Sequence, residues 1–133
     1  MGFRAVILLD THSWIWWAVG SPKLSARART SIDEARAIGV SAISCWEVAM
    51  LVQRRRITFD RDTLLWVQQA LARPGVRLLP ITPQVAVSST QLGDAAPADP
   101  ADRLIIATAR EEKIPVVTRD TEIVDSGLCE TLW

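Results

Sequence analysis

The chain has 133 residues, of which 49% are hydrophobic and 23% charged, and its 15 Lys and Arg are balanced by 15 Asp and Glu. This length and composition predict a single globular domain over residues 1–133 and exclude an intrinsically disordered chain. A formal net charge of zero excludes binding to nucleic acid through bulk positive charge, so any such binding must use a local patch.

The first element is a short apolar run, Ala5 to Leu9, which Asp10 ends. The run is far too short to span a bilayer, and the start of the chain lacks the basic region and cleavage site of a signal peptide. We therefore expect a cytoplasmic protein that does not associate with membranes. The continuous apolar pattern instead predicts a buried strand of a parallel sheet, followed by a short helix over Thr11 to Ala18.

The next elements alternate in the same way. Ser21 followed by Pro predicts the start of a helix that reaches Ala37, and Ile38 to Ile43 suits a short strand. Ser44, with Glu47 three residues later, has the form of a capping box, which predicts a helix from there to about Arg54.

The second half of the chain continues the alternation of helices and strands. Asp60 to Leu71 predicts an amphipathic helix whose apolar side includes Leu64, Leu65 and Val67. Strands separated by helices in this order predict an α/β fold, with a mostly parallel sheet covered by helices on both faces. The further predicted elements are a strand over Val76 to Ile81, a helix over Pro83 to Leu92, a helix from Asp99 that ends before Pro115, a strand at Val116 and Val117, and a terminal strand over Cys129 to Trp133.

Acidic residues follow the strands of this expected sheet. Asp10 and Asp120 come directly after strands, while Glu47, Asp99 and Asp102 lie at the starts of helices. All of them should approach the carboxyl edge of the sheet, where such folds bind ligands. Clustered carboxylates repel one another unless a cation offsets their charge. Mg²⁺ or Mn²⁺ prefers oxygen ligands and supports phosphodiester hydrolysis by an activated water.

Helix capping offers a purely structural role for three of these acids. Glu47 fits a capping box, Asp99 suits an N-cap, and Asp102 in a first helical turn favours the helix dipole. An acid directly after a buried apolar strand is a poor choice for stability. For Asp10 and Asp120 we therefore favour a functional role.

Four segments occur in an informative order: Leu8 to His12, Ser44 to Ala49, Asp99 to Ala107, and Val117 to Asp120. With these segments the chain resembles PIN-domain ribonucleases of the VapC toxin type, the toxin half of bacterial type II toxin–antitoxin pairs, over nearly its full length. The resemblance implies a PIN-like three-layer α/β/α fold. It also implies a Mg²⁺-dependent endoribonuclease that hydrolyses RNA.

The resemblance assigns roles to the acids. It implies a metal-binding and catalytic quartet of Asp10, Glu47, Asp102 and Asp120, with Asp99 as a nearby fifth acid. Asp10 and Asp102 would be the most direct Mg²⁺ ligands, and Asp120 would lie further out or hold a second ion.

Four further residues are candidates for substrate binding: Thr11, Arg103, Arg54 and Arg55. Thr11 is expected to support the site through its hydroxyl, and Arg103 to contact either RNA phosphate or a neighbouring acid. Arg54 and Arg55, which begin a run of three Arg, either complement a helix dipole or contact the RNA backbone. Relatives often carry His two residues before the Asp-Pro pair, where this chain has Pro97.

Tryptophan is unusually frequent, with six Trp and no Tyr. Trp14, Trp16 and Trp17 crowd one short helix, so we expect some of them at the surface, where a Trp cluster marks a protein interface. RNA base stacking is the alternative for one of them. Trp46 and Trp133 are expected in the core. The family resemblance implies a homodimer and an antitoxin chain that wraps the toxin.

Two other functions compete with this interpretation. A phosphatase of the haloacid-dehalogenase type also places Asp after its first strand, but it needs a second Asp two residues later, where this chain has His12. We expect His12 at the surface or at a helix start. A catalytically silent PIN-like scaffold is disfavoured, because it has no reason to keep carboxylates in mutual repulsion.

Overall fold

The computed structural model describes residues 5–133, in which five parallel strands form one sheet. The prediction that the chain has no signal peptide depends partly on residues 1–4, which lie outside the described residues. The sheet confirms the predicted α/β fold with a parallel sheet. In spatial order the strands are β3 (Val76–Leu79), β2 (Ala37–Ser41), β1 (Val6–Leu9), β4 (Val116–Val117) and β5 (Thr131–Leu132).

Seven helices accompany the sheet within residues 5–133, and each begins at a capping side chain. A Ser, Thr or Asp oxygen accepts a hydrogen bond from a backbone N–H two or three residues later, which satisfies one of the free donors at the helix start. The helices are α1 (Thr11–Val19), α2 (Ala26–Asp33), α3 (Ala42–Gln53), α4 (Thr63–Leu71), α5 (Pro83–Ser89), α6 (Pro100–Glu112) and α7 (Thr121–Ser126).

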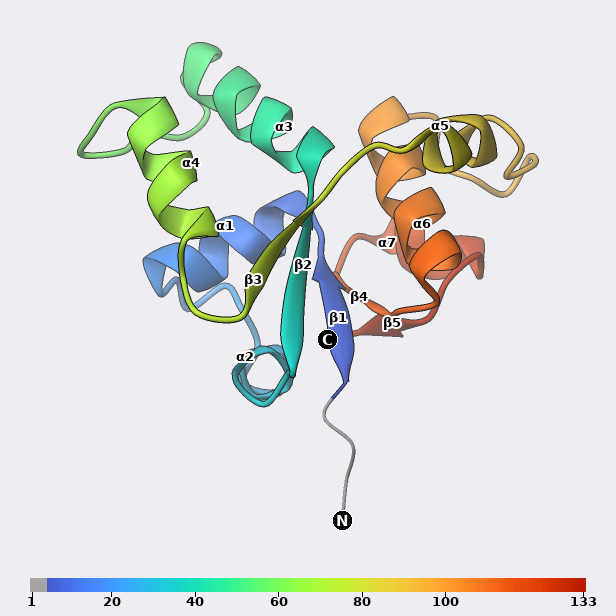
Figure 1. The fold of residues 1–133 in the computed structure, drawn as a ribbon, viewed down its shortest axis with the longest axis horizontal. Coiled ribbons are helices and arrows are strands. Elements are labelled where there is room, and N and C mark those ends of the chain that lie inside the picture. The colour runs from blue at the N-terminus through green and yellow to red at the C-terminus, as the bar shows by residue number, and fades with distance from the viewer. Residues whose placement is uncertain (1–4) are drawn as a thin grey trace.

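The helices cover both faces of the sheet, as predicted. In Figure 1, α1, α2 and α4 lie on one side of β1 and β2, and α5, α6 and α7 lie on the other. Alternate residues of β1 serve the two layers: Ile7 and Leu9 join the core with α1 to α4, whereas Leu8 packs with Ile105 of α6. All three strand residues are at most 1% exposed. A strand buried on both faces explains the continuous apolar run in the sequence.

The predicted helix from Ser21 to Ala37 is wrong at both ends. α2 begins only after Ser25, whose Oγ accepts from the Ala28 N–H at 3.0 Å. The Ser21 N–H bonds to the Trp16 carbonyl at 2.8 Å, so Ser21 closes α1 instead of starting α2. At the other end, Ala37 already belongs to β2.

The predicted capping box at Ser44 and Glu47 is also wrong. The N-cap of α3 is Ser41, whose Oγ accepts from the Ile43 N–H at 3.2 Å, so the helix begins three residues earlier. Ser44 is fully buried inside the helix. Glu47 therefore lies in the second turn, and capping does not explain it.

The apolar side predicted for α4 is rotated. Leu64 and Leu65 are 62% and 44% exposed, while Trp66, Val67 and Ala70 are buried. The reason is the size of the Trp66 side chain, whose burial next to two other aromatic rings fixes the rotation of α4.

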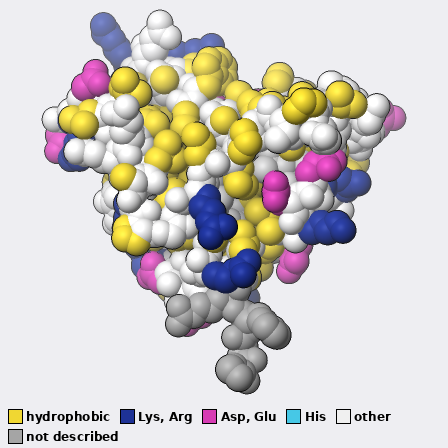
Figure 2. Space-filling model, viewed as in Figure 1, with side chains coloured by type: hydrophobic (Ala, Val, Ile, Leu, Met, Phe, Trp, Pro, Cys, Tyr) yellow, Lys and Arg dark blue, Asp and Glu magenta, His cyan; other side chains and the backbone are white. Residues whose placement is uncertain are grey.

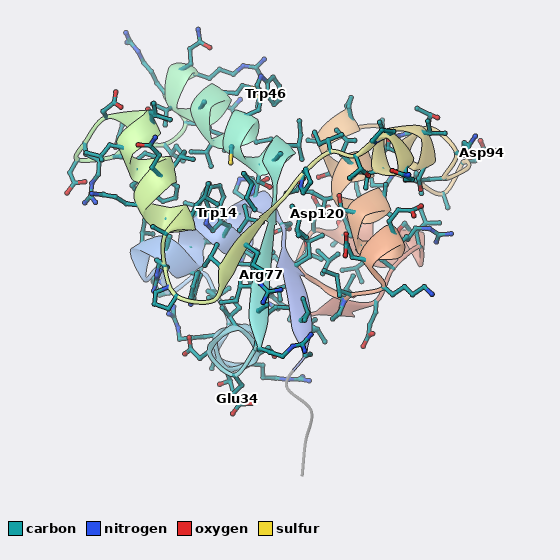
Figure 3. The ribbon with its side chains drawn as sticks, in the orientation of Figure 1. Trp14, Glu34, Trp46, Arg77, Asp94 and Asp120 are labelled. Atoms are coloured by element: carbon teal, nitrogen blue, oxygen red, sulfur yellow. The ribbon has the colours of Figure 1, made fainter. Side chains whose placement is uncertain are left out.

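The tryptophans are distributed differently from the prediction. Trp14 and Trp17 are buried, and Figure 3 shows Trp14 between the sheet and α4; only Trp16 of the cluster is partly exposed. Trp46, expected in the core, is 57% exposed. It lies two residues after Ser44, and two residues along a helix point to nearly opposite sides. Trp133 packs against the main core, as expected.

The remaining differences from the predicted elements concern a few residues at element ends and one helix. β3 and α5 end two and three residues earlier than predicted, at Leu79 and Ser89, and the sequence interpretation missed α7. No helix within residues 5–133 is both long and apolar enough to cross a membrane.

Candidate active site

The carboxyl ends of β1, β2 and β4 gather the acidic residues (Figure 1). Asp10 follows β1 directly, as predicted, whereas Asp120 stands three residues after the end of β4 and not directly after it. Glu47 projects from α3, which begins at the end of β2, while Asp99 and Asp102 lie at the start of α6. In Figure 3, Asp120 lies beside the carboxyl end of β1, on the α6 side of the molecule.

Asp10 is the most rigidly held acid. Its Oδ1 accepts from the Ser13 N–H at 2.9 Å as the N-cap of α1, and its Oδ2 accepts from the Thr118 hydroxyl at 2.5 Å. The side chain is 7% exposed. Burial raises the pKa of Asp10, although the hydrogen bonds from Thr118 and Ser13 oppose this.

Thr118 connects Asp10 to Asp120. While its hydroxyl donates to Asp10, the same oxygen accepts from the Asp120 N–H at 3.0 Å, and the residue is fully buried. The sequence interpretation gave Thr118 no role, although it lies in the last of the four motif segments. Its place between a strand end and an acid was the available signal.

Glu47 is held by α1. Thr11 Oγ1 donates to Glu47 Oε1 and lies 2.9 Å from the hydroxyl of Ser44, so the predicted supporting role of Thr11 has a specific partner. Burial raises the pKa of Glu47, the Thr11 hydroxyl opposes that, and the negative charges of Asp99 and Asp10 raise it further.

Asp102 responds to every other acid of the group. Burial is the largest cause that raises its pKa to about 7, followed by the charges of Asp99, Asp120, Glu47 and Asp10. These effects place the other four carboxylates within electrostatic reach of Asp102. The structure therefore gathers the quartet and the fifth acid at one edge of the sheet.

Asp99 and Asp120 are also helix caps. Asp99 Oδ1 accepts from the Ala101 N–H at 2.8 Å, and Asp120 Oδ1 accepts from the Glu122 N–H at 2.9 Å. The structural role considered for Asp99 is thus real, and Asp120 has one too. Both carboxylates therefore have a fixed position at the start of a helix.

The donor set fits a hard divalent cation. It consists of carboxylate oxygens, and none of the five acids forms an ion pair with a Lys or Arg among residues 5–133. Within this part of the chain no three carboxylate, His or Cys side chains have converged to the spacing of a metal site. Burial and the charges of neighbouring acids raise the pKa of Asp102, and carboxylate oxygens without a cationic partner among the described residues are the ligands that a hard divalent cation prefers.

The predicted basic contacts lie further out. Arg54 is the C-cap of α3, and Arg55 follows it; both are exposed. Seven residues of helix separate Arg54 from Glu47, a distance of about 10 Å along the axis. Arg103 Nε donates to the carbonyl of Pro97 at 2.6 Å, which fastens the loop before α6.

A third group of residues extends the site. His12, Trp16 and Arg119 line a cavity beside Asp10 and Asp120. His12 is exposed, as predicted, but the sequence interpretation gave neither it nor Arg119 a place at the site.

Comparisons with known proteins identify the family of the chain. The model of the PIN domain family matches residues 7–126. Ribonuclease VapC22 from Mycobacterium tuberculosis is 40% identical over 117 residues, which cover 88% of each chain.

Solved structures share the fold. A DNA-bound VapBC structure from Salmonella typhimurium aligns with a TM-score of 0.72 and 18% identity over 97% of this chain and 98% of that one. The FitAcB structure from Neisseria gonorrhoeae aligns with a TM-score of 0.65 and 24% identity over 96% of each chain.

Proposed function

The chain belongs to the PIN domain family, and on that premise we propose that it is a Mg²⁺-dependent endoribonuclease, the toxin of a type II toxin–antitoxin pair. The observation that carries the proposal is that Asp102 lies within electrostatic reach of four other carboxylates at one edge of the sheet, and that none of the five pairs with a Lys or Arg among the described residues. The relative named ribonuclease VapC22, at 40% identity, supports both the activity and the toxin class. We also propose that residues 1–133 form a single domain, of which the family model matches residues 7–126.

Asp10, Glu47, Asp102 and Asp120 are proposed as the catalytic metal-binding residues, with Asp99 as a further ligand. When bound, Mg²⁺ or Mn²⁺ supplies an activated water and offsets charge on the scissile phosphate. The protein contributes position: caps and buried hydroxyls fix the acids before substrate arrives, so little reorganisation is needed during hydrolysis.

The hydroxyls of Thr118 and Thr11 act through the acids that they contact. Thr118 holds Oδ2 of Asp10, and Thr11 holds Oε1 of Glu47. Hydrogen bonds to the charged form favour it and oppose the effect of burial. These hydroxyls thus help keep the buried Asp10 and the half-buried Glu47 ionised and able to bind a cation near neutral pH.

We propose that Arg54 and Arg55 hold RNA phosphates beyond the acidic edge, and that Arg103 contributes from the start of α6. The two exposed Arg directly follow α3, the helix that carries Glu47, so an RNA strand crossing the acids can reach them. Replacing Arg54 and Arg55 together with Gln should raise KM severalfold, most strongly at low salt, and leave kcat unchanged.

The same proposal includes two protein partners, a cognate antitoxin and a second copy of the chain. Solved relatives include a toxin–antitoxin complex from Klebsiella pneumoniae. Large hydrophobic side chains are exposed here, among them Trp46 on α3, Leu64 on α4 and Val87 on α5. Figure 2 shows hydrophobic side chains over the upper part of the visible face. Light scattering of the purified chain tests the dimer, and copurification with the product of a neighbouring short gene tests the antitoxin.

Cleavage of total RNA by protein freed of antitoxin tests the activity. We expect cleavage with Mg²⁺ or Mn²⁺ and none in excess EDTA. Asp10→Asn and Asp102→Asn should each reduce cleavage at least about a hundredfold, because loss of a ligand removes several kcal/mol of charge stabilisation. Asn is as good an N-cap as Asp, so Asp10→Asn keeps the start of α1.

Asp62→Asn is the matched control. Asp62 caps α4, is exposed, and lies outside the acidic group, so this variant should cleave RNA like the unvaried protein. Undiminished cleavage in EDTA, or by Asp10→Asn, would refute the metal mechanism. No cleavage with any divalent metal would instead favour a silent scaffold.

Membership of the PIN family removes the haloacid-dehalogenase alternative. An RNA substrate is consistent with a cytoplasmic location, which we also propose.

A further inference from the structure

A cavity of about 410 Å³ opens next to the acidic group, and the proposed hydrolysis leaves most of its lining unused. Its volume is in the range of small-ligand sites. Asp10 and Asp120 form one side. The remaining lining residues are His12, Trp16, Arg119 and Thr121.

Arg119 forms a flat platform within this cavity. Its guanidinium carbon lies 4.5 Å from the centroid of the Trp16 ring and 5.9 Å from that of Trp133. The two indole rings are 6.1 Å apart and inclined at 67°, so they enclose the guanidinium from two directions. Such cation–π contacts hold the planar fork of Arg in a defined orientation.

The platform is open and its charge is unpaired. Arg119 is exposed, and it forms no ion pair with Asp10, Asp120 or any other acid within residues 5–133. His12 lies one helical turn before Trp16 on α1, with the ring centroids 5.7 Å apart and the ring planes inclined at 49°, and forms a further aromatic wall of the same cavity. A planar ligand can therefore stack on a surface that borders the acidic group.

We propose that this cavity is a nucleobase subsite, in which an unpaired base of the RNA next to the bound phosphate stacks on Arg119 and the rings behind it. Proteins recognise single-stranded RNA by stacking its bases on aromatic rings or on Arg planes. The base in this cavity and the phosphate bound at the acids would belong to the same nucleotide or to adjacent nucleotides. The inference rests on the proposed ribonuclease function, since it assigns a specificity site beside the same acids.

Two RNA probes of equal charge separate base binding from phosphate binding. One is a fluorescein-labelled decamer of uridine, and the other is the same decamer with stable abasic sugars. Affinities are measured by fluorescence anisotropy in the Asp102→Asn background, in which cleavage is suppressed and the cavity lining is intact. The preference for the uridine decamer over the abasic one reports on the bases.

Arg119→Lys keeps the charge and loses the plane. We expect it to leave the affinity for the abasic decamer within twofold and to reduce the preference for the uridine decamer by about 5- to 150-fold, the equivalent of one stacked base. Trp16→Leu, which removes the backing ring, should act in the same direction. Arg77→Lys on β3, an exposed Arg outside the cavity, is the matched control and should change neither affinity.

The outcomes are distinct from those of the cleavage test. An equal loss for both probes in Arg119→Lys would make the cavity a phosphate site, and no loss for either would mean that RNA does not use it; both results overturn the proposal. If Trp16→Leu and Arg119→Lys lose the preference while the unvaried protein cleaves no RNA, the nucleobase subsite stands and the nuclease proposal fails. Thermal unfolding confirms that each variant is folded before binding is measured.

Discussion

The metal-free protein should become less stable as pH rises, because of Asp102. Its pKa in the folded protein is about 7, against 3.8 for an ordinary Asp side chain. Between these values the folded state binds more protons than the unfolded state, so the free energy of unfolding falls as pH increases. The favourable contribution of protonated Asp102 is complete below its ordinary pKa and is lost as pH rises through about 7.

The size of this change in the free energy of unfolding follows from the difference between the two pKa values and from the partial burial of Asp102. At about 1.4 kcal/mol for each pH unit, a fully buried group with this pKa would cost about 4 kcal/mol when ionised. Asp102 is only partly buried, and solvent screens part of the repulsion from the other acids. We therefore expect unfolding to require about 1–2 kcal/mol less at pH 8 than at pH 5.

Urea unfolding in EDTA from pH 5 to pH 8 measures this slope. Asp102→Asn should flatten it, with a gain in the free energy of unfolding that is about 1–2 kcal/mol larger at pH 8 than at pH 5, because Asn cannot ionise in either state. Mg²⁺ added at pH 8 should stabilise the unvaried protein more than the variant, since the ion replaces the proton as the counter-charge. Asp62→Asn, outside the acidic group, should keep the original slope. Parallel pH profiles for Asp102→Asn and the unvaried protein would refute the electrostatic reasoning.

Two further predictions concern positioning and packing. Thr118→Val removes the hydroxyl that donates to Asp10, a bond to a charged group worth about 1.5–3 kcal/mol, and should move the acid limb of the RNA cleavage profile up by about 1–2 pH units. Thr108→Val, which loses an equally buried hydroxyl bonded only to its own helix, should not move that limb, and an equal movement in both variants would count against the role of Thr118. Gly39→Ala should lower the free energy of unfolding by about 1–3 kcal/mol, because the added Cβ would stand 2.7 Å from Leu79 Cδ1 and 3.3 Å from a backbone oxygen of β1; an unchanged urea midpoint would show that the sheet yields at this position.

The sequence predicted the sheet and the acids well because both leave local marks. A strand covered on both faces must be apolar throughout, as β1 is, and a parallel sheet needs a crossover between successive strands. Asp10 and Asp120 are recognisable because an acid at the end of such a strand has no packing role. The same local reasoning fails at the start of α3, where Ser41 and Ser44 are both possible N-caps. The end of β2 decides between them, because the helix begins directly after this strand, at Ser41.

The sequence by itself therefore determined the α/β order, the position of the acids and the family. Tertiary structure alone decided which side of α3 and α4 is buried, how Thr118 links Asp10 to Asp120, and how Arg119 meets Trp16. These features depend on side chains that are distant in sequence: 108 residues separate Thr118 from the carboxylate that it holds. A local pattern records the backbone geometry and burial of its own segment, whereas a contact between segments exists only after the sheet has brought their ends together.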